Sequence, residues 1–166
     1  MTEATHIDEQ LYALAVSVGR AALARGVMLA TAESCTGGLV AGAITAVAGS
    51  SGWFERGFVT YSDQAKLDQL GVPAGTIERF GAVSTETALA MARGALSASR
   101  AQWALAVTGI AGPSGGTPDK PVGTVCFGWA GPGLADAVQR HFDGDRATVR
   151  RTSVRVALGG LLDRLA

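Results

Sequence analysis

The chain contains 166 residues, the length of one domain that can form its own hydrophobic core. Apolar residues make up 48% of it and charged residues 17%, which excludes a disordered or fibrous chain. Basic and acidic side chains number 14 each, so the chain lacks the excess positive charge of a nucleic-acid-binding protein. We therefore expect one globular domain over residues 1–166 that binds neither DNA nor RNA.

Two cysteines, Cys35 and Cys126, are too few for a disulfide scaffold and lie in apolar segments, which favours a reducing compartment. Residues 1–10 include Glu3 and Asp8, where a secretory signal would have basic residues followed by an apolar stretch. No apolar run reaches the length of about 18 residues that a membrane-spanning helix needs. We expect a cytoplasmic protein with no membrane span.

Hydrophobic periodicity predicts three helices and two strands in the N-terminal part of the chain. Apolar residues from Leu11 to Leu23 recur at helical spacing, and Gly26 ends the pattern. Short runs of β-branched and aromatic residues predict the strands, and capping residues such as Ser62 precede helical stretches. In chain order we predict a helix over residues 7–25, a strand over 27–31, a helix over 39–47, a strand over 53–61 and a helix over 63–70.

The C-terminal part predicts a long helix, a long loop and a hairpin. A short helix over 77–80 is followed by a helix that Ser84 caps and that ends near residue 100. A strand over 103–108 leads into a loop over 109–120 that is dense in glycine and proline. Strands over 122–130 and 134–142 form a hairpin, and Asp145 caps a terminal helix. Predicted helices and strands alternate in the first part of the chain, and a hairpin follows near its end. This order predicts an α/β domain with a mixed sheet and helices on both faces.

Three segments differ from ordinary core or surface composition: residues 31–38, 60–66 and 108–123. Each follows a predicted strand, and α/β sheets bind ligands at the ends of their strands. The three segments therefore predict one ligand-binding crevice.

Ser34 lies between a buried strand and a helix that glycines open. Its hydroxyl can therefore lie beside backbone N–H groups that stabilise an oxyanion or hold a phosphate. The alternative is that Ser34 or Thr36 only caps the helix. Glu33 is a candidate acid or base, although a carboxylate at a helix start more often interacts with the helix dipole. Cys35 is a second candidate nucleophile, but a small buried thiol is the favoured interpretation because no basic residue is near it in sequence.

The use of lysine is a more specific signal than the Ser34 segment. The chain has twelve arginines and only two lysines, and both Lys66 and Lys120 lie in the unusual segments. Lysine can lose its proton when it is desolvated and act as a base, whereas arginine stays charged. A neutral Lys66 beside Ser34 would form a serine–lysine nucleophile, with Tyr61 relaying the proton or fixing the amine. The alternative is an exposed helix lysine and a tyrosine at the rim.

The glycine-rich loop contains a match to the G-x-S-x-G nucleophile motif at Ser114, but prolines follow it where that motif needs a helix. The preferred interpretation is that backbone N–H groups of the loop and Lys120 bind an anion. Arg146, at the start of the last helix, is a candidate bidentate partner for phosphate. Arg150 and Arg151 are assigned to a solvated helix face.

Neither histidine, His6 nor His141, has the spacing of metal ligands, so we expect no metal. A serine–histidine–aspartate triad would require His141 and is disfavoured. The chain also lacks the glycine motifs of dinucleotide and nucleoside-triphosphate sites, and we expect no cofactor.

Five segments taken together resemble the CinA C-terminal domain family. They are AESCTGG at 32–38, YSDQAK at 61–66, GAVS at 81–84, TGIAGPSGG at 108–116 and KPVG at 120–123. The resemblance covers the chain from about residue 10 to its end. It implies a three-layer α/β/α fold and hydrolysis of nicotinamide mononucleotide to nicotinic acid mononucleotide and ammonia. It further implies that Ser34 is the nucleophile, that Lys66 and Tyr61 activate it, and that the glycine-rich loop contributes to the nucleotide pocket.

The expected partner is a small nucleotide substrate, and we expect a homo-oligomer. Two alternatives stay open: a non-catalytic nucleotide-binding or oligomerisation module, and an amidase for another small amide. The residues expected to bind substrate are Glu33, Thr36, Gly37, Gly38, Thr108, Gly109, Ala111, Gly112, Gly115, Gly116, Lys120 and Arg146.

Overall fold

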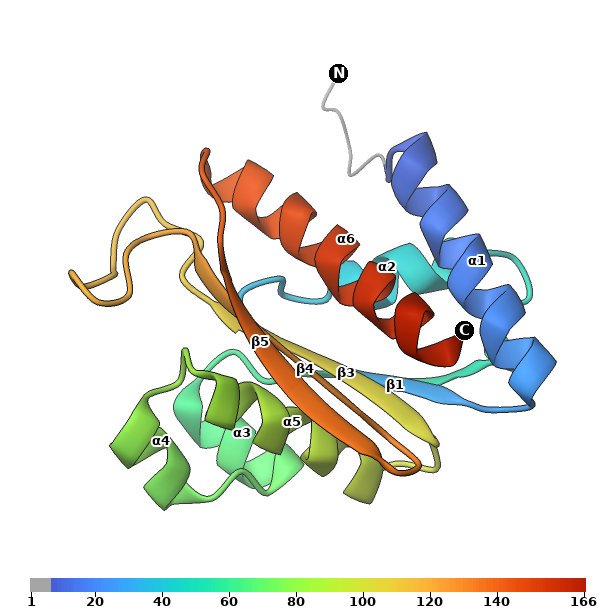
Figure 1. Cartoon of the computed structure of the whole chain (residues 1–166), viewed down its shortest axis with the longest axis horizontal. Coiled ribbons are helices and arrows are strands. Elements are labelled where there is room, and N and C mark those ends of the chain that lie inside the picture. Colours follow the sequence, from blue (N-terminus) through green and yellow to red (C-terminus); the bar gives the residue numbers. More distant parts are fainter. Residues whose placement is uncertain (1–6) are drawn as a thin grey trace.

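The computed structural model describes residues 7–166 as one five-stranded sheet between two layers of helices (Figure 1). The expectations that rest on Glu3 and His6 fall on residues 1–6 and lie outside the described residues. No helix within residues 7–166 combines the length and the apolar character needed to cross a bilayer.

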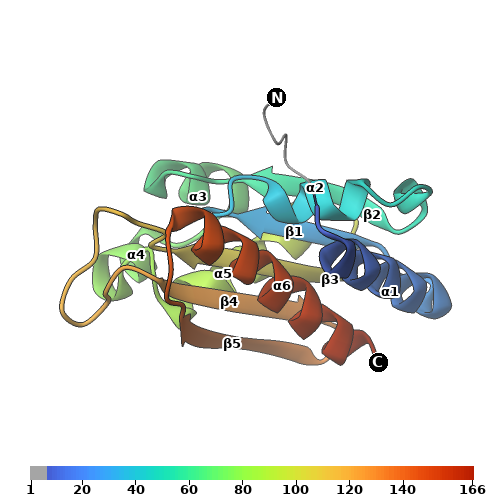
Figure 2. The same cartoon turned by 90° about the horizontal axis from the view of Figure 1, so that it is seen from above.

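The sheet is mixed, as predicted. Its strand order is β2-β1-β3-β4-β5, which Figure 2 shows from above. β1 pairs in parallel with both β2 and β3, and the remaining two pairs are antiparallel. The strands are β1 (Leu29–Glu33), β2 (Phe54–Val59), β3 (Trp103–Gly109), β4 (Thr124–Gly131) and β5 (Leu134–His141).

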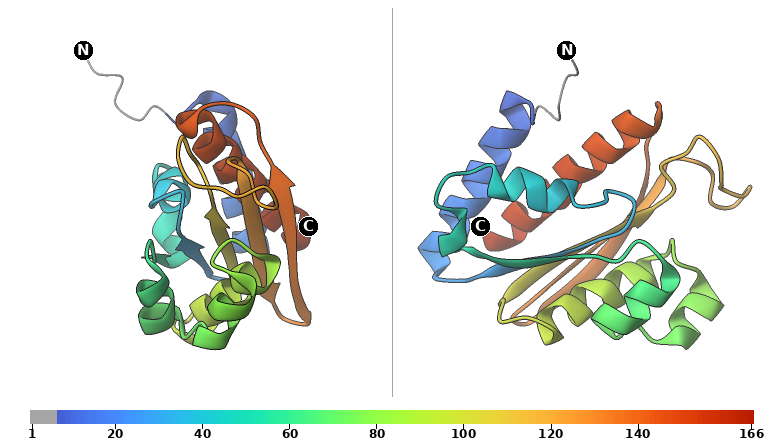
Figure 3. Two further views of the ribbon diagram at one scale, coloured as in Figure 1. Left: turned by 90° about the vertical axis from the view of Figure 1, so that its left-hand side faces the viewer. Right: turned by 180° about the vertical axis from the view of Figure 1, so that it is seen from behind.

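Helices cover both faces of the sheet, which confirms the predicted α/β/α layering (Figures 1 and 3). One face carries α1 (Glu9–Arg25), α2 (Leu39–Thr45) and α6 (Arg146–Leu165), and the other carries α3 (Asp63–Leu70), α4 (Ala74–Phe80) and α5 (Thr85–Ser97). A short 3₁₀ turn, Ser50–Gly52, precedes β2.

The predicted caps of three helices are confirmed. The side chains of Ser62, Ser84 and Asp145 each accept a hydrogen bond from a backbone N–H in the first turn of the helix that follows. Such caps satisfy N–H groups that a helix leaves without a partner, so the local sequence fixes where these helices begin.

Several predicted boundaries are wrong by two or three residues, and two of these differences have a clear cause. β1 begins at Leu29 instead of residue 27, because the Val27 N–H completes the end of α1 by bonding to the carbonyl of Ala22. α4 begins at Ala74 instead of residue 77, with Pro73 as its N-cap. Proline is tolerated there because the first N–H groups of a helix have no partner within it.

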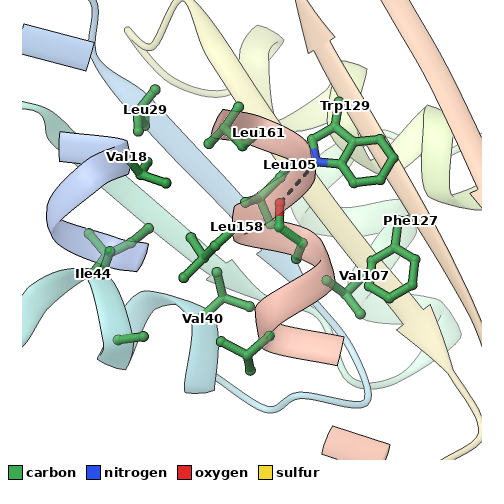
Figure 4. Packing of buried hydrophobic residues seen from close by; sticks show 14 of the residues in the cluster. Val18, Leu29, Val40, Ile44, Leu105, Val107, Phe127, Trp129, Leu158 and Leu161 are labelled. Atoms are coloured by element: carbon green, nitrogen blue, oxygen red, sulfur yellow. Dashed lines mark hydrogen bonds between the residues drawn. The ribbon is translucent and has the colours of Figure 1, made fainter. Parts of the chain in front are cut away.

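The larger core cluster lies between the sheet and the layer formed by α1, α2 and α6 (Figure 4). Leu158 and Leu161 of α6 pack on this face together with Leu105 of β3, and all three are fully buried. The indole N–H of Trp129 donates to the carbonyl of Ala157 over 3.0 Å. This bond satisfies the one polar group that the indole brings into the core, and it ties α6 to the sheet.

On the opposite face, α5 approaches the sheet closely. A Cβ atom at Gly128 of β4 would lie 2.4 Å from the carbonyl oxygen of Ala88 in α5, so only glycine fits. Small side chains such as Ala104 and Ala106 of β3 form the adjoining core. Close packing on both faces holds the ends of the strands in fixed positions.

The strand order determines where a site can form. The chain leaves β1 for β2 on one side and later returns to β3 on the other side of β1. In such sheets the crevice beyond the carboxyl end of the central strands is the usual ligand site. The carboxyl ends of β1, β2 and β3 lie at the same edge because these strands are parallel.

Candidate active site

The structure brings the three predicted segments together at this edge. Ser34 follows β1, Tyr61 follows β2, and Thr108 lies near the end of β3. Lys66 reaches the same place from α3, and Arg146 reaches it from the first residue of α6. The predicted convergence of these segments at one edge of the sheet is therefore confirmed.

Ser34 and Lys66 form a direct pair. The Nζ atom of Lys66 lies 3.0 Å from Ser34 Oγ, within hydrogen-bond distance. Lys66 is 1% exposed and Ser34 is 8% exposed. Lys66 is thus not the exposed helix lysine of the alternative interpretation.

Burial shifts the protonation equilibrium of the Lys66 amine toward its neutral form. Burial lowers the pKa of Lys66, and the negative charge of Asp63 opposes that shift. Nζ also lies within hydrogen-bond distance of the carbonyl oxygens of Thr60 (2.9 Å), Tyr61 (3.4 Å) and Ser62 (3.4 Å). A neutral amine can donate its two hydrogens to such carbonyls and accept the Ser34 proton on its lone pair. The pair can therefore act as nucleophile and base.

Glu33 anchors the helix that follows the nucleophile. Its carboxylate is fully buried and accepts hydrogen bonds from the N–H groups of Val40 (2.8 Å) and Ala41 (3.0 Å). The N-cap of α2 is Gly38, with no side-chain cap bond. The interpretation of Ser34 or Thr36 as a simple cap is therefore wrong, because Glu33 bonds the first turn from the preceding strand.

The turn between Ser34 and α2 leaves backbone donors open. The N–H groups of Cys35, Thr36 and Gly38 have no hydrogen-bond acceptor among residues 7–166. The first turn of α2, by contrast, is occupied by the Glu33 carboxylate, which would repel a phosphate. This arrangement favours a single oxyanion beside Ser34, and it favours binding of a phosphate elsewhere.

Tyr61 contributes through two different groups. Its backbone carbonyl lies 3.4 Å from Ser34 Oγ and 3.4 Å from Lys66 Nζ. Its phenol oxygen accepts a hydrogen bond of 3.2 Å from Arg146, and the residue is 63% exposed. Arg146 also donates to the carbonyl of Gly112 over 2.8 Å. Arg146 therefore joins the tyrosine side chain to the glycine-rich loop.

The glycine-rich loop has a buried base and an exposed tip. Ala111 and Gly112 are buried, whereas residues 113–119, which include Gly115 and Gly116, are exposed (Figure 1). The Lys120 amine donates to the carbonyl of Phe80 over 2.7 Å, so it fastens the loop to the end of α4. Thr108 lies near the carboxyl end of β3, and its hydroxyl donates to the carbonyl of Ala82 over 2.8 Å.

The other residues considered as nucleophile, base or metal ligand lie away from Ser34 or have unsuitable chemistry. Ser114 is exposed and no helix follows it. Burial raises the pKa of the Cys35 thiol to about 12, which makes it a poor nucleophile. The ring of His141 bonds to the carbonyl of Val122, and no hydrogen bond within residues 7–166 joins it to Ser34. Within the same residues, no group of three or more metal-ligating side chains is placed to hold an ion.

Arg150 is the site residue that the sequence analysis missed. Instead of lying on a solvated face, its guanidinium donates to the carbonyls of Cys35 (3.2 Å) and Thr36 (3.4 Å). Its position four residues after Arg146 places both side chains on one face of α6. That spacing is the signal that would have identified it.

The chain resembles characterised and structurally determined proteins along most of its length. It matches the CinA C-terminal domain over residues 11–165. A protein named nicotinamide-nucleotide amidohydrolase PncC from Pseudomonas putida is 57% identical over 132 residues, which cover 80% of this chain and 82% of that protein. The protein of the same name from Escherichia coli strain K12 is 51% identical over 152 residues, covering 91% and 92%.

The fold is also shared. The crystal structure described as competence/damage inducible protein CihA from Agrobacterium tumefaciens superposes with a TM-score of 0.90 at 45% identity, covering 96% of this chain and 98% of that one. A structure described as the competence damage-inducible protein A (ComA) from Klebsiella pneumoniae gives the same TM-score at 42% identity, with 93% and 96% covered. The predicted family is thus confirmed: the chain belongs to the CinA C-terminal domain family.

Proposed function

We propose that this protein is a nicotinamide-nucleotide amidohydrolase that converts nicotinamide mononucleotide to nicotinic acid mononucleotide and ammonia. The names and high identity of its relatives support this substrate. The observation that carries the chemistry is the buried contact between Lys66 Nζ and Ser34 Oγ.

Acylation is the first half of the proposed reaction. Neutral Lys66 takes the proton of Ser34 while Oγ attacks the carboxamide carbon, and a tetrahedral intermediate forms. The N–H groups of Cys35 and Thr36 are the proposed donors to the oxyanion, because they directly follow the nucleophile and have no acceptor within residues 7–166. The C–N bond then breaks, and protonated Lys66 returns its proton to the leaving nitrogen, which departs as ammonia.

Deacylation repeats the same roles with water. Lys66, neutral again, takes a proton from a water molecule that attacks the acyl carbon. The bond to Ser34 Oγ breaks, and Oγ regains a proton from Lys66. The carboxylic acid loses its remaining proton to water and is released as the carboxylate. The carbonyls of Thr60, Tyr61 and Ser62 hold the amine in place through both halves.

Arg146 is the proposed phosphate ligand. A guanidinium has five N–H donors, and the described bonds to Tyr61 and Gly112 use two of them. The remaining donors suit bidentate contact with a phosphate. Tyr61 and the base of the loop then line the nucleotide side of the proposed site. Glu33 does not face the substrate in this proposal, because its carboxylate bonds the first turn of α2.

The test is ammonia release from nicotinamide mononucleotide by the purified protein, with Ser34→Ala as the matched control. We expect release by the wild type only, with nicotinic acid mononucleotide as the second product. Activity in Ser34→Ala equal to that of the wild type would remove Ser34 from the mechanism. The predicted homo-oligomer stays a prediction, which light scattering of the same sample would check.

A further inference from the structure

Arg150 has a polar arrangement that the proposed mechanism does not use. The residue lies on α6, yet its guanidinium bonds two consecutive backbone carbonyls, those of Cys35 and Thr36, in the turn that follows the nucleophile. Both carbonyls belong to peptide groups just beyond Ser34. The contact therefore acts on the orientation of these peptide groups.

Peptide geometry determines what that orientation does. A trans peptide is planar, and its C=O and N–H bonds point in opposite directions. The carbonyl of Cys35 shares its peptide group with the N–H of Thr36. When Arg150 draws the Cys35 carbonyl toward α6, the Thr36 N–H must point away from α6. That N–H is one of those without an acceptor among residues 7–166.

Gly37 provides a second, independent observation at the same contact. It adopts a positive φ of +57°, and a Cβ atom there would lie 3.3 Å from Arg150 Nη2. A side chain at this position would therefore be strained and would press on the guanidinium. The absence of a side chain leaves the space in which Arg150 reaches both carbonyls.

We propose that Arg150 is a positioning residue that holds the Thr36 N–H in the direction of the developing oxyanion. The inference rests on the proposed amidase function and adds to it a residue from the last helix. Arg150 does not touch the substrate in this role. Its effect passes through the peptide group between Cys35 and Thr36.

The kinetic test compares Arg150→Met and Arg150→Lys with Arg151→Met, an exposed neighbour on α6. Loss of one oxyanion donor lowers kcat by about 10²–10³-fold in other hydrolases, so a misdirected donor should cost about 10- to 100-fold. We expect that loss in kcat for Arg150→Met, with little change in KM. Arg150→Lys, which can reach only one carbonyl, should fall between it and the wild type. Normal kcat in Arg150→Met would overturn the proposal.

Two further measurements separate positioning from a merely structural role. In Arg150→Ala, guanidinium chloride at millimolar concentration should restore part of kcat, and it should not raise the kcat of Arg151→Ala. In ¹⁵N-labelled protein, the Thr36 amide resonance should shift far more in Arg150→Met than in Arg151→Met. An unchanged Thr36 resonance would contradict the proposal. If the wild type releases no ammonia, the proposed function fails, whereas an active wild type with an unchanged Thr36 resonance in Arg150→Met overturns the positioning role alone.

Discussion

Arg146 Nη2 lies 3.2 Å from the phenol oxygen of Tyr61, although the two residues are 85 positions apart in the chain. The contact brings the first residue of α6 to the segment that follows β2. It also places a guanidinium with unused donors beside a tyrosine side chain that is largely exposed to solvent. This placement leads to the first prediction.

Removal of the substrate phosphate should weaken recognition through Arg146. A charge-assisted contact contributes about 1.5–3 kcal/mol, which corresponds to roughly a ten- to hundredfold change in affinity. We expect nicotinamide riboside to show a kcat/KM lower by that factor than nicotinamide mononucleotide. Arg146→Ala should narrow the gap, and Arg151→Ala should leave it unchanged. Equal kcat/KM values for both substrates in the wild type would show that the phosphate is not recognised.

Lys66→Arg should remove most activity even though it keeps the positive charge. Arginine stays protonated at any accessible pH, so it cannot accept the Ser34 proton. We expect kcat to fall by about 10²–10⁴-fold, the usual contribution of a general base. Because a larger side chain at a buried position risks misfolding, Lys66→Met should be assayed in parallel and both variants checked by circular dichroism. Near-normal turnover in Lys66→Arg would show that Lys66 supplies only charge.

The pH dependence of kcat/KM should report the Lys66 amine. Burial lowers its pKa, so the active neutral form becomes populated at lower pH than in an exposed lysine. We expect kcat/KM to rise with pH and then level off, with a midpoint below the range of ordinary lysines. Asp63 raises the pKa of Lys66, so Asp63→Asn should move the midpoint to still lower pH. A midpoint that moves upward in Asp63→Asn would mean that another group is being titrated.

Glu33→Gln should destabilise the fold. The carboxylate is fully buried and holds two N–H groups at the start of α2, and hydrogen bonds to charged groups contribute about 1.5–3 kcal/mol. An amide can accept only one of the two bonds through its oxygen. We expect the free energy of unfolding in urea to fall by about that amount, whereas Glu78→Gln, at an exposed position of α4, should change it little. An unchanged midpoint in Glu33→Gln would contradict the anchoring role.

The sequence predicts the fold well because the local signals agree with the packing. The starts of three helices are indicated by N-cap residues, whose hydrogen bonds to the first turn need no tertiary partner; these are Ser62, Ser84 and Asp145. The starts of β1 and α4 were misplaced because each depends on a backbone group whose partner the hydrophobic pattern does not reveal. The Val27 N–H belongs to the end of α1, and α4 begins three residues before the segment over which a helix was predicted, with Pro73 as its N-cap.

The site was predicted less completely, for a different physical reason. The pairing of Ser34 with Lys66 could be inferred from residue chemistry, because a rare lysine stood in an unusual segment. The spacing of Arg146 and Arg150 indicates that both lie on one face of α6, but no sequence signal identifies the backbone groups that Glu33 and Arg150 bond, since any N–H or C=O can be a partner. Only the three-dimensional arrangement identifies which one it is.

The place of α6 in the chain makes part of the site depend on long-range folding. Ser34 and Lys66 are 32 positions apart and both precede β3, whereas Arg146 and Arg150 lie on the helix that follows β5. The bonds of these two arginines to Tyr61 and Cys35 span 85 and 115 positions, so they form only when α6 packs on the sheet. A chain in which α6 is undocked therefore contains the serine and the lysine but lacks both guanidinium contacts.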